Sequence, residues 1–326
     1  MAAVRLEAIR ALTHVTDVLV TGATGFAGSH LIDLVQPSGA SITGWRRTGH
    51  PRPEANPSVQ WQAVDLLDRD AVRRAIAEVR PSKVFHCAGA AHVGQSWDDA
   101  RETLATNVLG THHLLNGLRA AGIGARVLIP GSSYVYRPSD HALKESDPIG
   151  PASPYALSKL AQEMLGARGG SDDGQEVFVT RSFNHIGARQ NPSFAVASFA
   201  RQIALIEAGR VAPTIQAGNL DTERDLTDVR DTVRAYRDIV ERGRPGTVYN
   251  VCSGRAYRIR DVLDRLIALS RVPVRVQIDA ARYRPHDTPL LLGDPTRLKE
   301  DVGWEPAIEL EQSLADLLEY WRKEVE

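Results

Sequence analysis

Short runs of apolar residues alternate along the chain with longer segments whose apolar residues recur every three to four positions. The short runs predict buried β-strands, and the longer segments predict helices that cover the faces of a sheet. From residue 17 onward this alternation is typical of a doubly wound parallel sheet. The predicted fold class is therefore α/β and Rossmann-like.

The first half of the chain carries the regular part of this pattern. Its predicted strands are about five or six residues long, as buried strands usually are, and cover 17–21, 40–45, 59–64, 83–88, 126–131 and 177–183. The predicted helices between them cover 27–34, 69–79, 101–121 and 154–165. Ser153 as N-cap and Pro154 at the first helical position are typical of the start of the last helix.

After Phe183 the pattern becomes irregular. Helices at 195–207, from 229 and from 259, a turn-rich stretch up to 223 and a strand at 247–252 predict a smaller C-terminal lobe of mixed α/β structure. We expect 17–183 to form the Rossmann-like domain, with 224–252 crossing back into it. Residues 184–223 and 253–326 are expected to form the lobe, and residues 1–16 an extension outside the fold.

Glycines at a spacing of three follow the first predicted strand and precede a helix. A glycine turn in this place lets backbone amides approach a pyrophosphate, and the helix N-terminus adds favourable partial charge. A turn with a purely structural role is the alternative, but the βαβ context favours dinucleotide binding. The turn residues expected to bind the cofactor are Gly22, Thr24, Gly25, Phe26 and Gly28.

The end of the second strand indicates which dinucleotide binds. It carries Arg46 and Arg47 and no carboxylate that would accept hydrogen bonds from a free ribose 2′-hydroxyl. Two guanidinium groups suit a 2′-phosphate, so we expect NADP, with a solvated basic loop in an NAD enzyme as the alternative. Asp65 is expected to meet the adenine amino group, or else to cap a helix, and Leu66 and Ala88 are expected at the same cofactor site.

Tyr155 and Lys159 lie one helical turn apart, so a phenol and an ammonium group face one pocket. Ser132 follows the preceding strand at its carboxyl end, where open α/β sheets bind ligands. We expect Ser132 to bind the reacting oxygen, Tyr155 to transfer a proton, and Lys159 to hold the nicotinamide ribose. Lys159 and an oxidised nicotinamide are expected to lower the Tyr155 pKa from about 10. Ordinary turn and helix-start roles are the alternative.

These motifs resemble the extended short-chain dehydrogenases/reductases that act on nucleotide sugars, over nearly the whole chain from residue 17. The marks of that family are the turn at 21–28, the NVLGT segment at 107–111, and Ser132 with Tyr155-x-x-x-Lys159. The downstream segments RSFNHIG, GNLDTERDLTDVRD, YNVCSG and RPHD are similar to its GDP-mannose branch; they occupy 181–187, 218–231, 249–254 and 284–287.

The resemblance implies residues that bind a nucleoside diphosphate sugar, expected to be GDP-linked. Arg224 and Arg284 correspond to family positions that hold the diphosphate, with exposed surface arginines as the alternative. Asp287 corresponds to a carboxylate on the nucleotide ribose, and Asn184 to an asparagine at the sugar and phosphate entrance, or else a loop cap. Ser133 is expected beside the sugar. Asn107 is expected to support the active-site network.

One departure from the family pattern limits which reaction we expect. The 4,6-dehydratases carry a glutamate where this chain has Tyr134, and a phenol without its own activator is a poor base for a carbon acid. Tyr134 is therefore expected to pack against the sugar. The resemblance then implies an NADP(H)-dependent 4-ketoreductase that converts GDP-4-keto-6-deoxy-D-mannose to GDP-D-rhamnose. An NAD(P)-dependent epimerase is the first alternative and a 4,6-dehydratase the second.

Composition narrows the partners and the compartment. Lys+Arg 39 against Asp+Glu 40 leaves a formal charge of −1, which does not favour nucleic-acid binding. No run of about 20 apolar residues predicts a membrane span. Cys87 and Cys252 lie in apolar runs and are expected to be buried free thiols of a cytoplasmic protein. We expect no metal site, and by analogy with the family a homodimer through helices 101–121 and 154–165.

Overall fold

The computed structural model describes residues 16–49, 56–172, 174–282 and 288–326. The chain divides into two compact units, and each is considered by itself. Unit 1 comprises Met1–Val135, Pro151–Arg181 and Tyr236–Val248; unit 2 comprises Tyr136–Gly150, Ser182–Ala235 and Tyr249–Glu326. The segment that returns to unit 1 is shorter than the expected 224–252.

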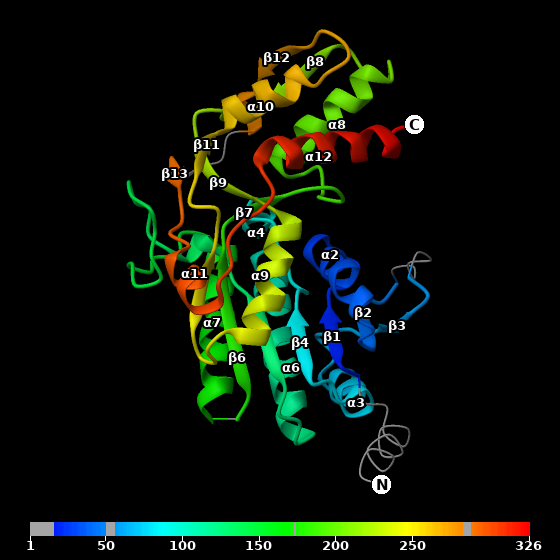
Figure 1. The fold of residues 1–326 in the computed structure, drawn as a ribbon, viewed down its shortest axis with the longest axis vertical. Helices are drawn as coiled ribbons and strands as arrows, with labels where there is room; N and C mark the ends of the chain where they lie inside the picture. The colour runs from blue at the N-terminus through cyan, green and yellow to red at the C-terminus, as the bar shows by residue number, and fades with distance from the viewer. Residues whose placement is uncertain (1–15, 50–55, 173, 283–287) are drawn as a thin grey trace. The chain divides into compact units, whose positions relative to one another are not determined.

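The sheet of the Rossmann-like fold has seven strands within the described residues, in the order β10-β6-β5-β4-β1-β2-β3 (Figure 1). β1 pairs in parallel with β2 on one side and with β4 on the other. The strand order therefore reverses at β1, and open α/β sheets bind ligands at the carboxyl ends of strands beside such a point. The strands are β1 Val18–Thr21, β2 Ile42–Arg46, β3 Val59–Ala63, β4 Lys83–His86, β5 Arg126–Pro130, β6 Glu176–Ser182 and β10 Val248–Val251.

Helices of unit 1 pack on this sheet through a buried apolar cluster to which β1, α3, α6, β5 and β6 all contribute. α3 begins where predicted because the Asp68 carboxylate accepts hydrogen bonds from the amides of Asp70 and Ala71. The predicted α/β class is confirmed. The helices are α2 Phe26–Val35, α3 Arg69–Val79, α4 Gln95–Asp98, α5 Ala100–Leu104, α6 Gly110–Ala120 and α7 Pro154–Asp172. A further helix, α9 (Val229–Arg242), begins in unit 2 and ends in unit 1.

Two helix predictions were wrong in detail. The segment 101–121 is not one α-helix, because a π-helical turn, η2 (Ala105–Leu109), separates α5 from α6 and contains the fully buried Asn107. α7 continues past the predicted end at 165 through Gly166. A Cβ on Gly166 would lie 3.0 Å from the Ile129 side chain, so this glycine serves close helix–sheet packing and does not end the helix.

Unit 2 is built from short strands and amphipathic helices around its own apolar cluster. β9 pairs with β7 and β13 in parallel and with β11 in antiparallel, while β8 pairs with β12. The strands are β7 Asn184–Ile186, β8 Thr214–Ala217, β9 Glu223–Asp228, β11 Ala256–Arg258, β12 Arg275–Ile278 and β13 Leu290–Leu291. The helices are α8 Ala195–Glu207, α10 Ile259–Ala268, α11 Thr296–Val302 and α12 Leu310–Glu324.

A search of the described helices for one that is both long and apolar enough to cross a membrane finds none.

Candidate active site

The glycine turn after β1 has the shape that a dinucleotide requires. Gly22 has φ +62°, and a Cβ there would lie 2.6 Å from the Ala88 backbone nitrogen. A Cβ on Gly28 would collide with the Gly22 carbonyl oxygen. Gly25 is the N-cap of α2 and offers no side-chain hydrogen bond to the first helical amides. These amides can therefore bind an anion, and the turn fits a pyrophosphate.

The residues expected at the adenosine end lie on the same side of unit 1. Arg46 ends β2 and is half-buried, while the exposed Arg47 side chain lies 3.3 Å from the Glu102 carboxylate. Asp65 accepts a hydrogen bond from the Leu67 amide at 2.9 Å. The helix-cap alternative for Asp65 is wrong, since Asp68 caps α3. Leu66 is partly buried and packs against the apolar cluster of unit 1.

The predicted catalytic residues lie at the carboxyl end of β5 and the start of α7. Ser132 is buried, accepts a hydrogen bond from the Tyr134 amide at 3.2 Å, and is hydrogen-bonded to Tyr155. The Lys159 ammonium donates to the Pro130 carbonyl at 3.0 Å and lies 6.0 Å from the centre of the Tyr155 ring. The structure thus brings a hydroxyl, a phenol and an ammonium group together.

Burial determines the protonation of this group. It raises the pKa of Tyr155 to about 12, against the opposing effect of the Ser132 hydrogen bond. It lowers the pKa of Lys159 to about 8. In the protein alone, loss of solvation is therefore the dominant effect on the Tyr155 pKa. The lowering of this pKa by Lys159 together with an oxidised nicotinamide stays a prediction for the complex with the cofactor. At neutral pH Tyr155 therefore carries its proton in the protein alone.

Asn107 holds the backbone beside these residues. Its carboxamide accepts from the Ala90 amide at 2.8 Å and donates to the Ala90 carbonyl at 3.1 Å and to the Ser158 hydroxyl at 2.8 Å. Ser158 in turn donates to the Tyr155 carbonyl at 2.7 Å. The π-helical turn that interrupts the predicted helix therefore carries the asparagine that links the segment after β4 to α7.

The sequence argument missed Ser96, which supports the start of α7. Its buried hydroxyl accepts from the Tyr155 amide at 3.2 Å and donates to the Val93 carbonyl at 2.6 Å. Ser153 also caps this helix, through the Ala156 amide at 3.1 Å. No local sequence pattern indicates Ser96, because it lies far from Tyr155 along the chain.

The predicted substrate residues fall into three groups. In unit 1, Ser133 is buried, and Tyr134 packs edge-to-face on Tyr155 with ring centres 6.4 Å apart. In unit 2, Asn184 begins β7, and Arg224 on β9 is buried and donates to the Glu223 carbonyl at 2.8 Å. Arg224 is therefore not an exposed surface arginine. Arg284 and Asp287 lie outside the described residues.

The described residues contain no group of three His, Cys, Asp or Glu side chains that could hold a metal ion. Cys87 and Cys252 are both free thiols. Cys252 is buried, as predicted, whereas Cys87 is half-buried.

Comparison with known proteins identifies the family. Residues 19–317 match the family described as GDP-mannose 4,6 dehydratase. The chain belongs to the GDP-mannose 4,6-dehydratase family. Within this family it is 36% identical over 311 residues to GDP-6-deoxy-D-mannose reductase of Pseudomonas aeruginosa, covering 94% of this chain and 98% of that protein.

Solved structures extend this family relationship. RMD from Pseudomonas aeruginosa, complexed with NADPH, superposes with a TM-score of 0.84 and 34% identity, covering 95% of this chain and 100% of that one. A UDP-glucose 4-epimerase from Thermotoga maritima, with UDP-glucose, gives a TM-score of 0.85 and 27% identity, covering 95% and 100%. Members of the GDP-mannose 4,6-dehydratase family and epimerases thus share this fold.

Proposed function

We propose that the chain is an NADPH-dependent nucleotide-sugar 4-ketoreductase that reduces GDP-4-keto-6-deoxy-D-mannose to GDP-D-rhamnose. The observation that carries this proposal is the grouping of the buried Tyr155 phenol with the buried Ser132 hydroxyl and with the Lys159 ammonium, 6.0 Å from the centre of the Tyr155 ring. A phenol held in its acid form suits reduction of a carbonyl, in which the oxygen gains a proton. The similarity to GDP-6-deoxy-D-mannose reductase supports the choice of substrate.

The residues of unit 1 have separate roles in this reaction. When bound, NADPH supplies the hydride for the sugar C4 carbon. Tyr155 donates its phenolic proton to the O4 oxygen, and the Ser132 hydroxyl donates a hydrogen bond to the same oxygen. Lys159 holds the nicotinamide ribose and keeps a positive charge beside the phenol. Gly22, Gly25 and Gly28 hold the pyrophosphate of the cofactor.

In unit 2 we assign Arg224 and Asn184 to the nucleotide sugar. Arg224 is a buried guanidinium anchored to the backbone, which suits a diphosphate that carries about two negative charges. The side-chain oxygen of Asn184 is buried and has no hydrogen-bond partner among the described residues. A ligand hydroxyl group would satisfy this oxygen.

The proposal is tested by incubating the protein with GDP-4-keto-6-deoxy-D-mannose and NADPH. We expect one NADPH to be consumed for each GDP-6-deoxyhexose formed. Formation of an isomeric sugar nucleotide without consumption of NADPH would identify an epimerase instead. UDP- and dTDP-4-keto-6-deoxyhexoses serve as controls for the nucleotide base.

The preference for NADPH is tested at Arg46 and Arg47. Removing both guanidinium groups as Arg46→Ala/Arg47→Ala is expected to raise KM for NADPH about ten- to hundredfold, because charge-assisted hydrogen bonds contribute about 1.5–3 kcal/mol. KM for NADH should change less than threefold. Arg73→Ala/Arg74→Ala, an exposed adjacent pair on α3, is the matched control. Equal losses with both cofactors would contradict a contact with the 2′-phosphate.

Lys159 sets the expected pH dependence. Its pKa is lowered to about 8 by burial, so its ammonium form predominates below that pH and is lost above it. Tyr155, with a pKa of about 12, stays protonated through the same range. We expect kcat/KM for the 4-keto sugar to be constant near neutral pH and to fall about tenfold per pH unit above the Lys159 pKa. Lys159→Arg should abolish this decrease, and a flat wild-type profile up to pH ~10 would contradict the assignment.

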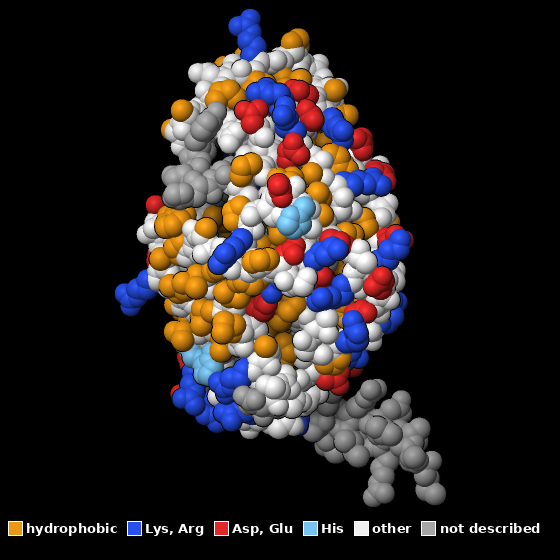
Figure 2. All heavy atoms as spheres, turned by 90° about the vertical axis from the view of Figure 1, so that its left-hand side faces the viewer, with side chains coloured by type: hydrophobic (Ala, Val, Ile, Leu, Met, Phe, Trp, Pro, Cys, Tyr) orange, Lys and Arg blue, Asp and Glu red, His pale blue; other side chains and the backbone are white. Residues whose placement is uncertain are grey.

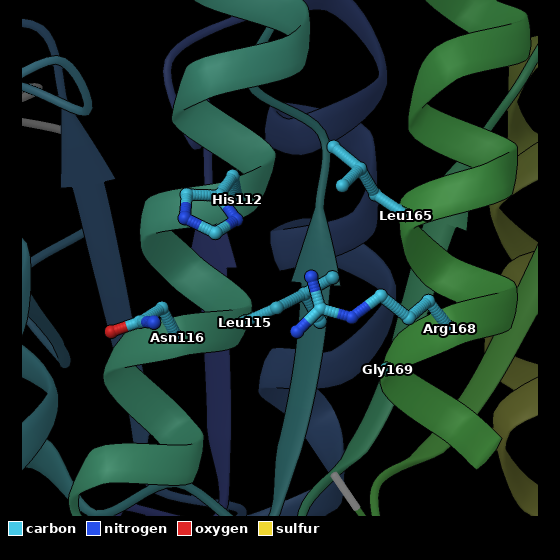
Figure 3. Close-up of a pocket in the computed structure, with 6 residues that line it drawn as sticks. All are labelled: His112, Leu115, Asn116, Leu165, Arg168 and Gly169. Carbon is cyan, nitrogen blue, oxygen red and sulfur yellow. The ribbon is translucent and has the colours of Figure 1, made fainter. Parts of the chain in front are cut away.

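We further propose a homodimer formed through α7 and its neighbour α6. Leu157 and Met164 lie two turns apart on α7 and are 50% and 65% exposed. Figure 2 shows hydrophobic side chains gathered on the side of unit 1 where α7 lies in Figure 1. Between α6 and α7 lies a pocket lined by His112, Leu165 and Arg168 among others (Figure 3).

The dimer is tested by sedimentation of Leu157→Glu/Met164→Glu. We expect the wild-type protein to have twice the chain mass and the variant to sediment as a monomer, because a charge at the centre of an interface is strongly unfavourable. Leu269→Glu, at an exposed apolar position in unit 2, is the control and should remain dimeric. A monomeric wild-type protein would contradict the proposal.

We place the protein in the cytoplasm, a location that the free thiols of Cys87 and Cys252 support.

A further inference from the structure

A chain of buried hydrogen bonds crosses unit 1 and has His86 at its centre. Thr21 and His86 are the last residues of β1 and β4 and lie opposite each other in the sheet. The Thr21 hydroxyl lies 2.8 Å from Nδ1 of His86, and Nε2 lies 3.0 Å from the Thr111 hydroxyl on α6. The Thr111 oxygen is also 2.6 Å from the Asn107 carbonyl and 2.6 Å from Nε2 of Gln162 on α7.

The direction of every bond in this chain follows from the groups at its ends. The Asn107 carbonyl can only accept, so Thr111 donates its single proton there. Thr111 must then accept from both His86 and Gln162, which places a proton on Nε2 of His86. At the other end the Ala88 amide can only donate, and it does so to the Thr21 oxygen at 3.2 Å.

The last proton to be placed in this chain of hydrogen bonds is that of the Thr21 hydroxyl. Burial, with a smaller effect of the Lys159 charge, lowers the pKa of His86 to about 3, so its ring is neutral and has one nitrogen without a proton. Because Nε2 carries the proton, Nδ1 is the acceptor, and Thr21 donates to it. Each hydroxyl and each ring nitrogen thus has a single consistent role.

This chain joins the cofactor turn to the catalytic helix. Thr21 precedes Gly22 and fixes Ala88, while Thr111 fixes the backbone of Asn107. The Asn107 side chain hydrogen-bonds to the Ala90 backbone. The segment after β4 is therefore held at Ala88 by Thr21 of β1 and at Ala90 by Asn107 of η2. The imidazole of His86 is the group that links the two hydroxyls.

We propose that His86 is a positioning residue whose ring, protonated on Nε2, couples the cofactor-binding turn at Thr21 to the Asn107 support of the active site. Only the effect of this coupling on turnover rests on the proposed function. Cofactor binding and the state of the ring test it independently of any substrate.

A double-mutant cycle measures the coupling. Thr21→Val and Thr111→Val each remove one hydroxyl partner of His86, and the two hydroxyls contact opposite nitrogens of the ring. We expect each variant to raise the Kd for NADPH, and the combined effect to differ from the product of the single effects by threefold or more. In a His86→Phe background the two effects should multiply. If the two effects on Kd also multiply in the wild-type chain, the proposal is overturned.

The matched control is Thr16→Val. Thr16 is buried on unit 1 and bonds the Thr43 hydroxyl at 3.1 Å, without contact to His86. It should lower stability but show no coupling to Thr111→Val in NADPH binding. Coupling of the same size at Thr16 would mean that general loosening of the sheet, not His86, links the sites, and would overturn the proposal.

Nitrogen NMR of the wild-type protein tests the ring directly, even if His86→Phe does not fold. We expect Nε2 protonated and Nδ1 unprotonated, unchanged between pH ~5 and ~8 because the pKa lies far below. Thr21→Val should shift the Nδ1 signal and Thr111→Val the Nε2 signal. A proton on Nδ1, or titration in this range, would overturn the proposal. If the protein turns over no 4-keto sugar but shows the tautomer and the coupling, the proposed function fails and this inference stands.

Discussion

Replacing Tyr155 with phenylalanine is expected to lower kcat about a thousandfold, within the 10²–10⁴ range typical of a lost general acid. The phenol is the group with a transferable proton next to Ser132, and burial keeps that proton in place at neutral pH. Phenylalanine preserves the ring and the edge-to-face packing on Tyr134. The Kd for NADPH should therefore change less than threefold. Stopped-flow measurement of NADPH oxidation separates the two effects.

Tyr134→Phe is the matched control for this experiment. It removes the hydroxyl of the neighbouring ring, whose centre lies 6.4 Å from that of Tyr155, and leaves Ser132 and Tyr155 intact. We expect its kcat to stay within about threefold of wild type. Full activity in Tyr155→Phe would exclude Tyr155 as the acid. A thousandfold loss of kcat in Tyr134→Phe would show that the hydroxyl of Tyr134 is also required for proton transfer, and would contradict the assignment to Tyr155 alone.

The second large effect is on stability, through the ion pair that fixes α7 to β6. The Arg181 guanidinium binds both oxygens of the Glu163 carboxylate, at 3.0 Å and 2.6 Å, and the two side chains are only 6% and 13% exposed. Arg181→Met leaves this carboxylate buried without its partner. We expect the free energy of unfolding to fall by about 3–5 kcal/mol, measured by urea denaturation.

A double variant separates the ion pair from simple packing. Arg181→Met/Glu163→Leu removes both charges and should recover most of the lost stability, because an apolar pair does not leave a buried charge. A double variant as unstable as Arg181→Met would contradict this explanation and assign the loss to the volume of the arginine side chain. The exposed pair of Arg255 and Glu309 offers a control, since Arg255→Met should change stability by less than about 1 kcal/mol.

The sequence predicted the sheet of unit 1 well because strands such as β1 and β5 are short, buried runs rich in apolar residues. β1 and β4, for example, differ from the predicted ranges only at their ends. The strands of unit 2 were mostly missed. β7, β11 and β13 have two or three residues each, too few for any hydrophobic period to appear. The π-helical turn at Asn107 was missed because helical periodicity does not register a single inserted residue.

The residues of the candidate site likewise divide into those that a local sequence pattern predicts and those that only the fold brings together. The glycine turn and the Tyr155–Lys159 spacing are local patterns whose chemistry follows from a few adjacent residues. Ser96, His86 and the pair of Glu163 and Arg181 act across long separations in sequence, so they could be found only from the fold. The protonation of Tyr155 also required the fold, because the amount of burial decides its pKa.

The most direct test of the central claim follows an isotope through the reaction. The protein is incubated with GDP-4-keto-6-deoxy-D-mannose and NADPH that carries deuterium at the transferable position of the nicotinamide C4. If the chain is a 4-ketoreductase, each NADPH consumed yields one GDP-6-deoxyhexose with deuterium at the sugar C4. A product that forms without loss of NADPH, or that carries no deuterium at C4, would contradict the account.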